Sequence, residues 1–75
     1  MIWNYLQDRR PLATESGCWD GLRSDKVLVC DRNGKYYIAT MYEGIIHGNE
    51  FCEFYDERDF EIENVMYWTE ITNAY

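Results

Sequence analysis

The sequence has only one histidine and lacks the even set of cysteines of a disulfide-bonded domain, and each absence excludes a class of protein. The only histidine, His47, lies in a glycine-containing turn, and neither a C-x-x-C pair nor a second histidine provides the ligand spacing of a zinc site. The three cysteines, Cys18, Cys30 and Cys52, are an odd and widely spaced set, whereas the disulfide framework of a secreted domain uses an even number. We therefore expect free, buried thiols and no metal.

Long hydrophobic runs and catalytic motifs are also missing. No apolar run approaches the ~20 residues of a membrane span, and residues 1–8 contain neither the basic n-region nor the long apolar h-region of a secretory signal. The chain has no GxGxxG, P-loop or HExxH motif, and no nucleophile elbow surrounds a cysteine that would act with His47. The sequence therefore predicts a cytoplasmic, non-enzymatic protein with no cofactor, no catalytic residue and no membrane association.

Positive charge is scarce as well, because seven Lys and Arg residues stand against fourteen Asp and Glu, a net charge of −7. Residues 1–49 hold equal numbers of acids and bases, so the surplus lies in residues 50–75, where eight acids accompany Arg58 alone. Phosphate groups are bound by clustered Lys and Arg. Direct binding to nucleic acid or to an anionic membrane is therefore not expected, whereas a protein partner with a basic surface is compatible with this charge.

Hydrophobic residues make up 47% and aromatic residues 17% of the chain, which predicts a folded domain over residues 1–75 rather than a disordered one. The clearest element is a hairpin over residues 26–42, with Asn33-Gly34 as a two-residue type I′ turn. The turn also fixes the register of the two strands. The predicted pairs are Val29 with Ile38, Val27 with Thr40, Leu28 with Ala39 and Cys30 with Tyr37.

Further segments complete the predicted sheet. Trp3–Leu6 is a first strand or an extended lead-in, and Val65–Ile71 is a final strand. Glu50–Tyr55 fits either a strand or a helical turn, and its shortness and aromatic content favour the strand. The polar residues 13–25 predict a loop with at most one helical turn. We therefore expect a mainly β fold, a small single-layer or partly rolled antiparallel sheet of about four strands around the 26–42 hairpin.

Several short motifs resemble those of a known family. They are Trp3, Asp8-Arg9 followed by Pro11, Lys26-Val27-Leu28-Val29, and the segment 65–71 with Trp68 near its centre. This pattern resembles a family of short domains of unknown function that is common in bacteriophages and prophages. The resemblance spans nearly the full chain; the long loop over residues 13–25 and the absence of a proline after Ile71 depart from it. It implies a small antiparallel β-domain of phage or mobile-element origin, and it implies no particular chemistry.

The predicted hairpin carries apolar side chains on both faces, although a strand pair buried on one face only should alternate apolar and polar residues. Three aromatic pairs place one ring on each side of a strand: Tyr36-Tyr37, Phe54-Tyr55 and Tyr67-Trp68. Core packing accounts for one side, and the other side faces a second layer or a partner. Because Tyr and Trp are favoured interface residues, we predict a partner-binding face with Tyr37, Met41 and Trp68. A homodimer would use the same face.

The acidic segment from Glu50 to Glu63 is the second candidate site. It lacks the glycine and the spacing of a Ca²⁺-binding loop. Its carboxylates form either a solvated surface that keeps the domain soluble or a contact for a basic protein. The residues predicted for this contact are Glu53, Asp56, Glu57, Asp59 and Glu61. We thus predict a protein-protein interaction module; the alternative is an acidic mimic of nucleic acid that inhibits a host DNA- or RNA-binding defence protein.

Overall fold

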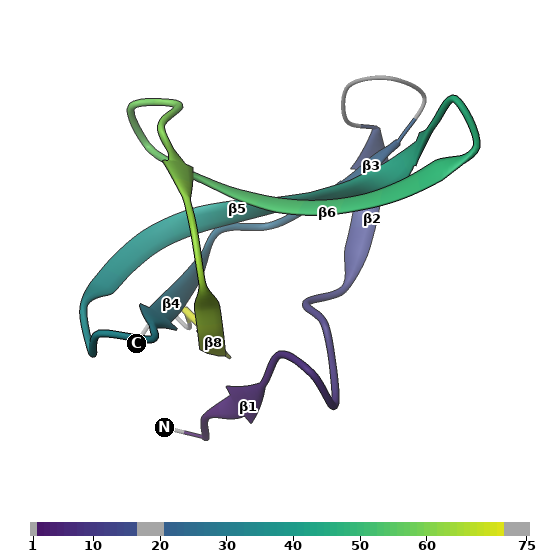
Figure 1. Ribbon diagram of the computed structural model, residues 1–75. Coiled ribbons are helices and arrows are strands. Elements are labelled where there is room, and N and C mark those ends of the chain that lie inside the picture. Colours follow the sequence, from purple (N-terminus) through teal and green to yellow (C-terminus); the bar gives the residue numbers. More distant parts are fainter. Residues whose placement is uncertain (1, 17–20, 72–75) are drawn as a thin grey trace.

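The computed structural model describes residues 2–16 and 21–71, and within these ranges the chain forms strands and turns with no helix. The strands are β1 (Asn4–Tyr5), β2 (Ala13–Ser16), β3 (Leu22–Ser24), β4 (Val27–Asp31), β5 (Tyr36–Ile46), β6 (Asn49–Asp56), β7 (Glu61–Ile62) and β8 (Val65–Glu70). All strand pairings are antiparallel and belong to one sheet (Figure 1). The predicted mainly β, antiparallel fold is confirmed, with more strands than expected. No helix that could span a membrane is present in the described ranges.

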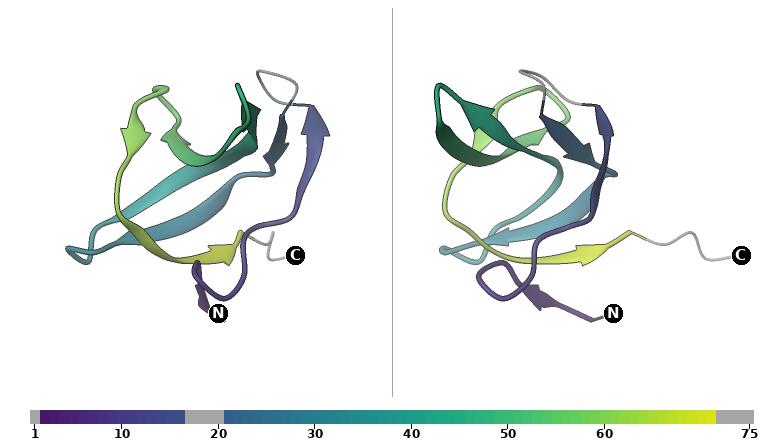
Figure 2. Two further views of the ribbon diagram at one scale, coloured as in Figure 1. Left: turned by 45° about the vertical axis from the view of Figure 1, so that its right-hand side comes forward. Right: turned by 90° about the vertical axis from the view of Figure 1, so that its right-hand side faces the viewer.

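The longest strand, β5, organises the sheet. One edge of β5 pairs first with β4 and then with β3, while its other edge pairs with β6 from Ala39 to Ile46. The sheet continues from β4 through β8 to β1, and the short strands β2 and β7 pair with β3 and β6. The sheet is strongly bent, and β8 follows β7 after only Glu63 and Asn64, so the chain runs directly from the part of the sheet that contains β6 to the part that contains β4 (Figure 2). Segments at the two ends of the sequence therefore meet, since β1 pairs with β8.

Alternate side chains of the central strands form the core. The buried residues are Val27, Val29, Ala39, Met41, Phe54, Ile62 and Trp68. Their spacing follows the period of two that a β-strand imposes on its faces. Trp68 also fixes the chain between β1 and β2, because its indole Nε1 donates a hydrogen bond of 2.7 Å to the carbonyl oxygen of Arg9.

The register predicted for the 26–42 hairpin is wrong by one residue. Val27 pairs with Ala39 and Val29 with Tyr37. The cause is the loop: the Gly34 N–H bonds to the Asp31 carbonyl at 3.1 Å, and the Asp31 N–H bonds to the Lys35 carbonyl at 2.9 Å. This is a three-residue loop, a type I turn followed by Gly34 at φ 82°, rather than a type I′ turn. A shift of one residue moves every side chain of one strand to the opposite face.

An aspartate side chain selects this longer loop. Asp31 Oδ1 accepts hydrogen bonds from the N–H groups of Asn33 (2.8 Å) and Lys35 (2.9 Å). The loop between β6 and β7 repeats this arrangement. Asp56 Oδ1 accepts hydrogen bonds from the N–H groups two and four residues later, those of Arg58 (2.8 Å) and Phe60 (3.0 Å). The sequence pattern Asp-x-x-Gly or Asp-x-x-Asp therefore builds both loops.

The type I′ geometry occurs in a different hairpin. His47 and Gly48 connect β5 and β6, and both have positive φ, 50° and 80°. Positive φ at both central residues of a two-residue loop is the signature of a type I′ turn, and its twist matches that of the long β5–β6 pair. His47 is thus a turn residue, exposed at the tip of this hairpin.

The predicted loop over residues 13–25 is wrong in part, because it contains β2 and β3. The two strands pair with each other, and an ion pair of 3.2 Å joins Arg23 to Glu15. Ser24 then fills the gap where β5 changes partner from β4 to β3: its buried Oγ accepts a hydrogen bond of 3.0 Å from the Met41 N–H and donates one of 2.7 Å to the Asp25 carbonyl. Residues 17–20 of the predicted loop, with Cys18, lie outside the described residues.

Candidate functional site

The outward side of β5, β4, β8 and β1 carries a row of aromatic side chains across four neighbouring strands. In the hydrogen-bonded register, Tyr36 lies opposite Cys30, Cys30 opposite Tyr67, and Tyr67 opposite Tyr5. Directly paired residues of antiparallel strands point to the same side of the sheet. The four side chains therefore stand next to one another on the side that faces away from the core residues Val29 and Trp68.

A second row runs beside the first. Ile38 pairs with Leu28, and Leu28 pairs with Thr69. Trp3 ends this row, because it lies two residues before Tyr5 and hence on the same side of the chain. The buried Thr69 hydroxyl donates a hydrogen bond of 2.6 Å to the Ile2 carbonyl, which holds the chain at Trp3 against β8.

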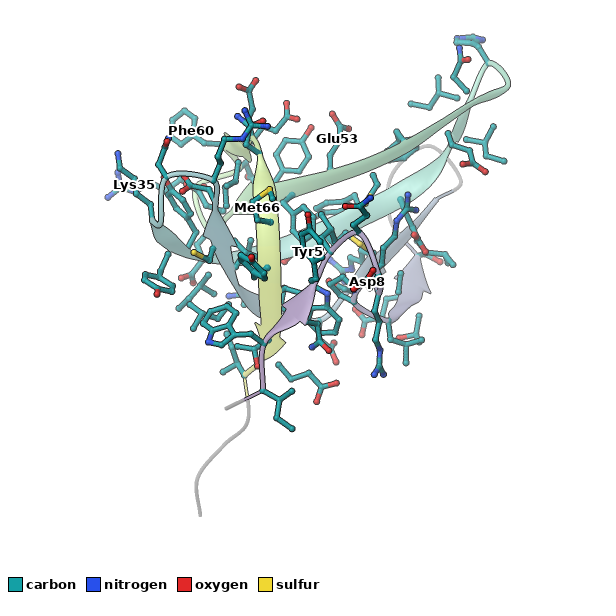
Figure 3. The ribbon with its side chains drawn as sticks, turned by 60° about the horizontal axis from the view of Figure 1, so that its bottom comes forward. Tyr5, Asp8, Lys35, Glu53, Phe60 and Met66 are labelled. Carbon is teal, nitrogen blue, oxygen red and sulfur yellow. The ribbon has the colours of Figure 1, made fainter. Side chains whose placement is uncertain are left out.

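We call the exposed part of these two rows the outer aromatic face. It consists of Trp3, Tyr5, Leu28, Cys30, Tyr36, Ile38 and Tyr67. The exposed fraction lies between 36% (Tyr5) and 63% (Tyr36) for the four aromatic residues and Ile38, whereas Leu28 and Cys30 are half-buried. In Figure 3, Tyr5 lies beside β8 in the middle of the view, whereas Glu53 and Phe60 lie toward its upper edge.

The rings of this face contact one another across the strands. The centroids of Trp3 and Tyr36 are 5.8 Å apart at an interplanar angle of 48°, and those of Tyr5 and Tyr67 are 5.3 Å apart at 32°. Tilted pairs at this separation are favourable contacts between aromatic rings. Trp3, Tyr36, Tyr67 and Cys30 line a shallow cavity of about 330 Å³. The rings are thus held in place before any partner binds.

The predicted contact residues do not share this face. Met41 and Trp68 are 0% and 2% exposed and belong to the core, so their assignment to a contact surface is wrong. Tyr37 packs against that core. Met41 and Tyr37 face the core because the register of the 26–42 hairpin differs by one residue from the predicted one. In the pairs Tyr36-Tyr37 and Tyr67-Trp68, it is the first residue of each pair that faces outward.

Four aromatic residues of the face were not predicted as contacts: Trp3, Tyr5, Tyr36 and Tyr67. Alternation along a strand separates Tyr36 from Tyr37 and Tyr67 from Trp68, but it does not say which side is the core. Trp3 and Tyr5 join the face only through the pairing of β1 with β8, which are separated by about sixty residues. Local sequence patterns carry no signal for that pairing.

The predicted acidic contact residues divide into two groups. Asp56 uses a carboxylate oxygen to hold the 57–60 loop, and Glu57 forms an ion pair of 3.2 Å with Lys26. Asp59 adopts a φ of 65° within the same loop. Glu61 instead lies opposite Tyr55 on the outward side of β6 and β7, and Glu53 lies two residues from Tyr55 on that side.

Glu53 and Glu61 have a further acidic neighbour. Together with Glu63 they line a cavity of about 380 Å³ beside β6 and β7. The structure therefore brings Glu53 and Glu61 together at one cavity, which Asp56, Glu57 and Asp59 do not line. No group of three or more His, Cys, Asp or Glu residues in the described ranges is arranged to hold a metal ion.

The two cysteines of the described ranges are free thiols, and both are half-buried. Cys30 lies within the outer aromatic face. Burial raises the pKa of the Cys52 thiol, the positive charge of Arg10 opposes this rise, and the carboxylates of Glu43 and Glu53 add to it. A thiol with a raised pKa is protonated at neutral pH and is a poor nucleophile.

Comparison with known proteins identifies no relative: no family model, no curated protein and no solved structure matches the chain.

Proposed function

We propose that the protein is a non-enzymatic protein-interaction module that binds its partner through the outer aromatic face. The observation that carries this proposal is the exposure of Trp3, Tyr5, Tyr36 and Tyr67 on one continuous side of four paired strands. No Lys, Arg, Asp or Glu belongs to the two rows of this face. Exposed apolar surface costs free energy in water and is a recurring property of binding sites.

The size of the face supports a protein as partner. Tyr and Trp side chains bury about 150–250 Å² when fully enclosed, so the exposed fractions of the four aromatic residues and Ile38 correspond to about 400 Å² of mainly apolar surface. A standard interface buries about 800 Å² per partner, of which roughly 56–65% is non-polar. The face therefore supplies nearly the whole apolar centre of such an interface.

The chemistry of the face supports the same reading. Tyr and Trp are enriched among residues whose truncation weakens protein complexes most. Their rings give a large contact area at a small cost in side-chain entropy, and ring contacts already hold Trp3 against Tyr36 and Tyr5 against Tyr67. Such preorganisation lowers the entropy that association must overcome.

The proposal is tested by capture from a nuclease-treated bacterial lysate, the source that the resemblance to phage-borne domains suggests. The immobilised wild type is compared with Tyr36→Ser and with the control Phe60→Ser. Phe60 is 64% exposed, as Tyr36 is at 63%, but it lies in the 57–60 loop outside the two rows. We expect a protein that the wild type and Phe60→Ser retain and that Tyr36→Ser releases. A set of captured proteins that is the same for all three would contradict the binding of a different protein through this face, and would leave only a second copy of the chain as its partner.

The second candidate function, mimicry of nucleic acid, is favoured by the grouping of Glu53, Glu61 and Glu63 around one cavity. A basic nucleic-acid-binding protein would be attracted to this carboxylate surface. The informative variant changes these three residues to Gln and leaves Asp56 and Glu57 in their loop. A partner that is lost from this variant, and that ~0.5 M NaCl releases from the wild type, would establish mimicry, because salt screens such contacts.

A further inference from the structure

We infer that the outer aromatic face joins two copies of this chain in a symmetric dimer. The inference rests on the proposed function, because it names the occupant of the same face. An isologous interface uses one patch on both subunits, so that patch must be complementary to itself.

The face meets the charge requirement of a self-complementary surface. A patch with charges of one sign repels its own copy, and a patch with charges of both signs must be arranged around the two-fold axis. The two rows contain no charged residue at all. Lys26, which precedes Leu28 by two residues, forms an ion pair of 3.2 Å with Glu57 within the subunit.

The polar groups of the face also suit a second copy. The hydroxyls of Tyr5, Tyr36 and Tyr67 form no hydrogen bond with other residues in the described part of the chain. A phenol hydroxyl both donates and accepts a hydrogen bond. Two copies of one tyrosine can therefore satisfy each other across a two-fold axis, without any charged partner.

The area of the outer aromatic face and the position of the acidic residues also suit a symmetric dimer. Homodimer interfaces are about 65% apolar, so the estimated 400 Å² of exposed apolar surface corresponds to a subunit interface of roughly 600 Å². The acidic surplus belongs to residues 50–75. Glu53 and Glu61 lie on β6 and β7, which contribute no residue to the face. A face-to-face dimer therefore leaves these carboxylates outside the interface, in water.

Charge also separates this occupant from a basic protein. Each subunit carries a net charge of −7, so two subunits repel each other at a distance. Salt screens this repulsion, and dimerisation should be unchanged or strengthened when NaCl rises from about 0.05 to 0.5 M. Binding of a basic partner should weaken over the same range. The direction of the salt effect therefore distinguishes the two occupants.

The test is sedimentation equilibrium of the purified full chain, from about 5 µM to 1 mM, since interfaces near this size give dissociation constants in the micromolar range or tighter. We expect the wild type and Phe60→Ser to form a dimer. Tyr36→Ser should raise the dissociation constant roughly 25-fold or more, because the symmetry removes the ring from both sides and each loss costs about fivefold or more. Circular dichroism establishes that each variant is folded, and Tyr36→Thr replaces Tyr36→Ser if the serine variant is not.

Three results would overturn the inference. The first is a wild type that stays monomeric at about 1 mM. The second is a dimer that Tyr36→Ser leaves intact, and the third is a dimer that Phe60→Ser disrupts as much as Tyr36→Ser does. A monomeric wild type that still captures a lysate protein, lost in Tyr36→Ser, would refute the dimer and leave the proposed function standing. If neither a second copy nor a lysate protein depends on Tyr36, the proposed function fails as well.

Discussion

Replacement of Ser24 by alanine should destabilise the fold far more than the loss of a serine hydroxyl usually does. Ser24 stands where β5 exchanges one neighbour for another, between the Val27–Ala39 pair and the Arg23–Tyr42 pair. Its Oγ is the acceptor for the N–H of Met41, which is fully buried. The backbone of β3 and β4 supplies no acceptor at this point, so the side chain replaces a missing rung of the sheet.

The magnitude follows from the burial of Met41. A buried N–H that loses its partner costs about 1–3 kcal/mol, and Ser24 itself is only 3% exposed, which keeps water from replacing the hydroxyl. We expect the Ser24→Ala variant to lose about 2 kcal/mol of unfolding free energy. In a domain of this size, that loss corresponds to a decrease in Tm of roughly 8–16 °C.

Urea unfolding monitored by circular dichroism measures this change directly. Ser16→Ala is the matched control, because Ser16 is an exposed residue of the edge strand β2 and should change the free energy of unfolding by less than about 0.5 kcal/mol. The slope of the unfolding free energy against urea should stay the same in both variants. A loss below about 0.5 kcal/mol in Ser24→Ala would refute the assignment of its hydroxyl as a substitute for a backbone acceptor.

Three further predictions concern other positions. Asp59 has a φ of 65°, and the corresponding position of the loop between β4 and β5 is Gly34. Asp59→Gly should therefore raise the free energy of unfolding by about 0.5–1 kcal/mol and Asp59→Ala should lower it, which urea unfolding of both variants measures. A Cβ at Gly44 would lie 2.8 Å from the ring of Phe51, so Gly44→Ala should lower Tm, and an unchanged Tm would contradict that close approach. Because burial raises the pKa of Cys52, mass-spectrometric mapping at neutral pH should find this thiol alkylated more slowly than a model thiol. As the pH rises, the unfolded chain loses the thiol proton before the folded chain does, so the free energy of unfolding should fall at alkaline pH.

The fold class followed from the sequence because its apolar segments are short, rich in β-branched and aromatic residues, and separated by turn residues. The register of the main hairpin did not follow, since Asn33-Gly34 is a strong type I′ signal and the two hydrogen bonds that Asp31 Oδ1 accepts outweigh it. The strands β2 and β3 were missed because their residues are mostly exposed and polar. Their stability comes from the pairing of β3 with β5 and of β2 with β3, which local composition does not report.

The candidate site depended on the same residue-level detail. Alternation predicted that one ring of each aromatic pair faces outward, and Tyr36 and Tyr67 confirm this for two pairs. The side that faces outward was assigned incorrectly for Met41, because a change of one residue in register exchanges the two sides of the strand. The contribution of Trp3 and Tyr5 requires the pairing of the first strand with the last, a contact that no local pattern specifies.

A dilution series of two-dimensional ¹H–¹⁵N NMR spectra tests, residue by residue, whether the outer aromatic face joins two copies of the chain. The indole N–H of Trp3 belongs to the outer aromatic face, whereas that of Trp68 is bonded to the Arg9 carbonyl at 2.7 Å and serves as an internal control. We expect rising concentration to shift the signals of Trp3, Leu28, Tyr36 and Tyr67 and to leave the Trp68 indole signal in place. Shifts confined to Glu53, Glu61 and their neighbours, or no shifts at all, would contradict it.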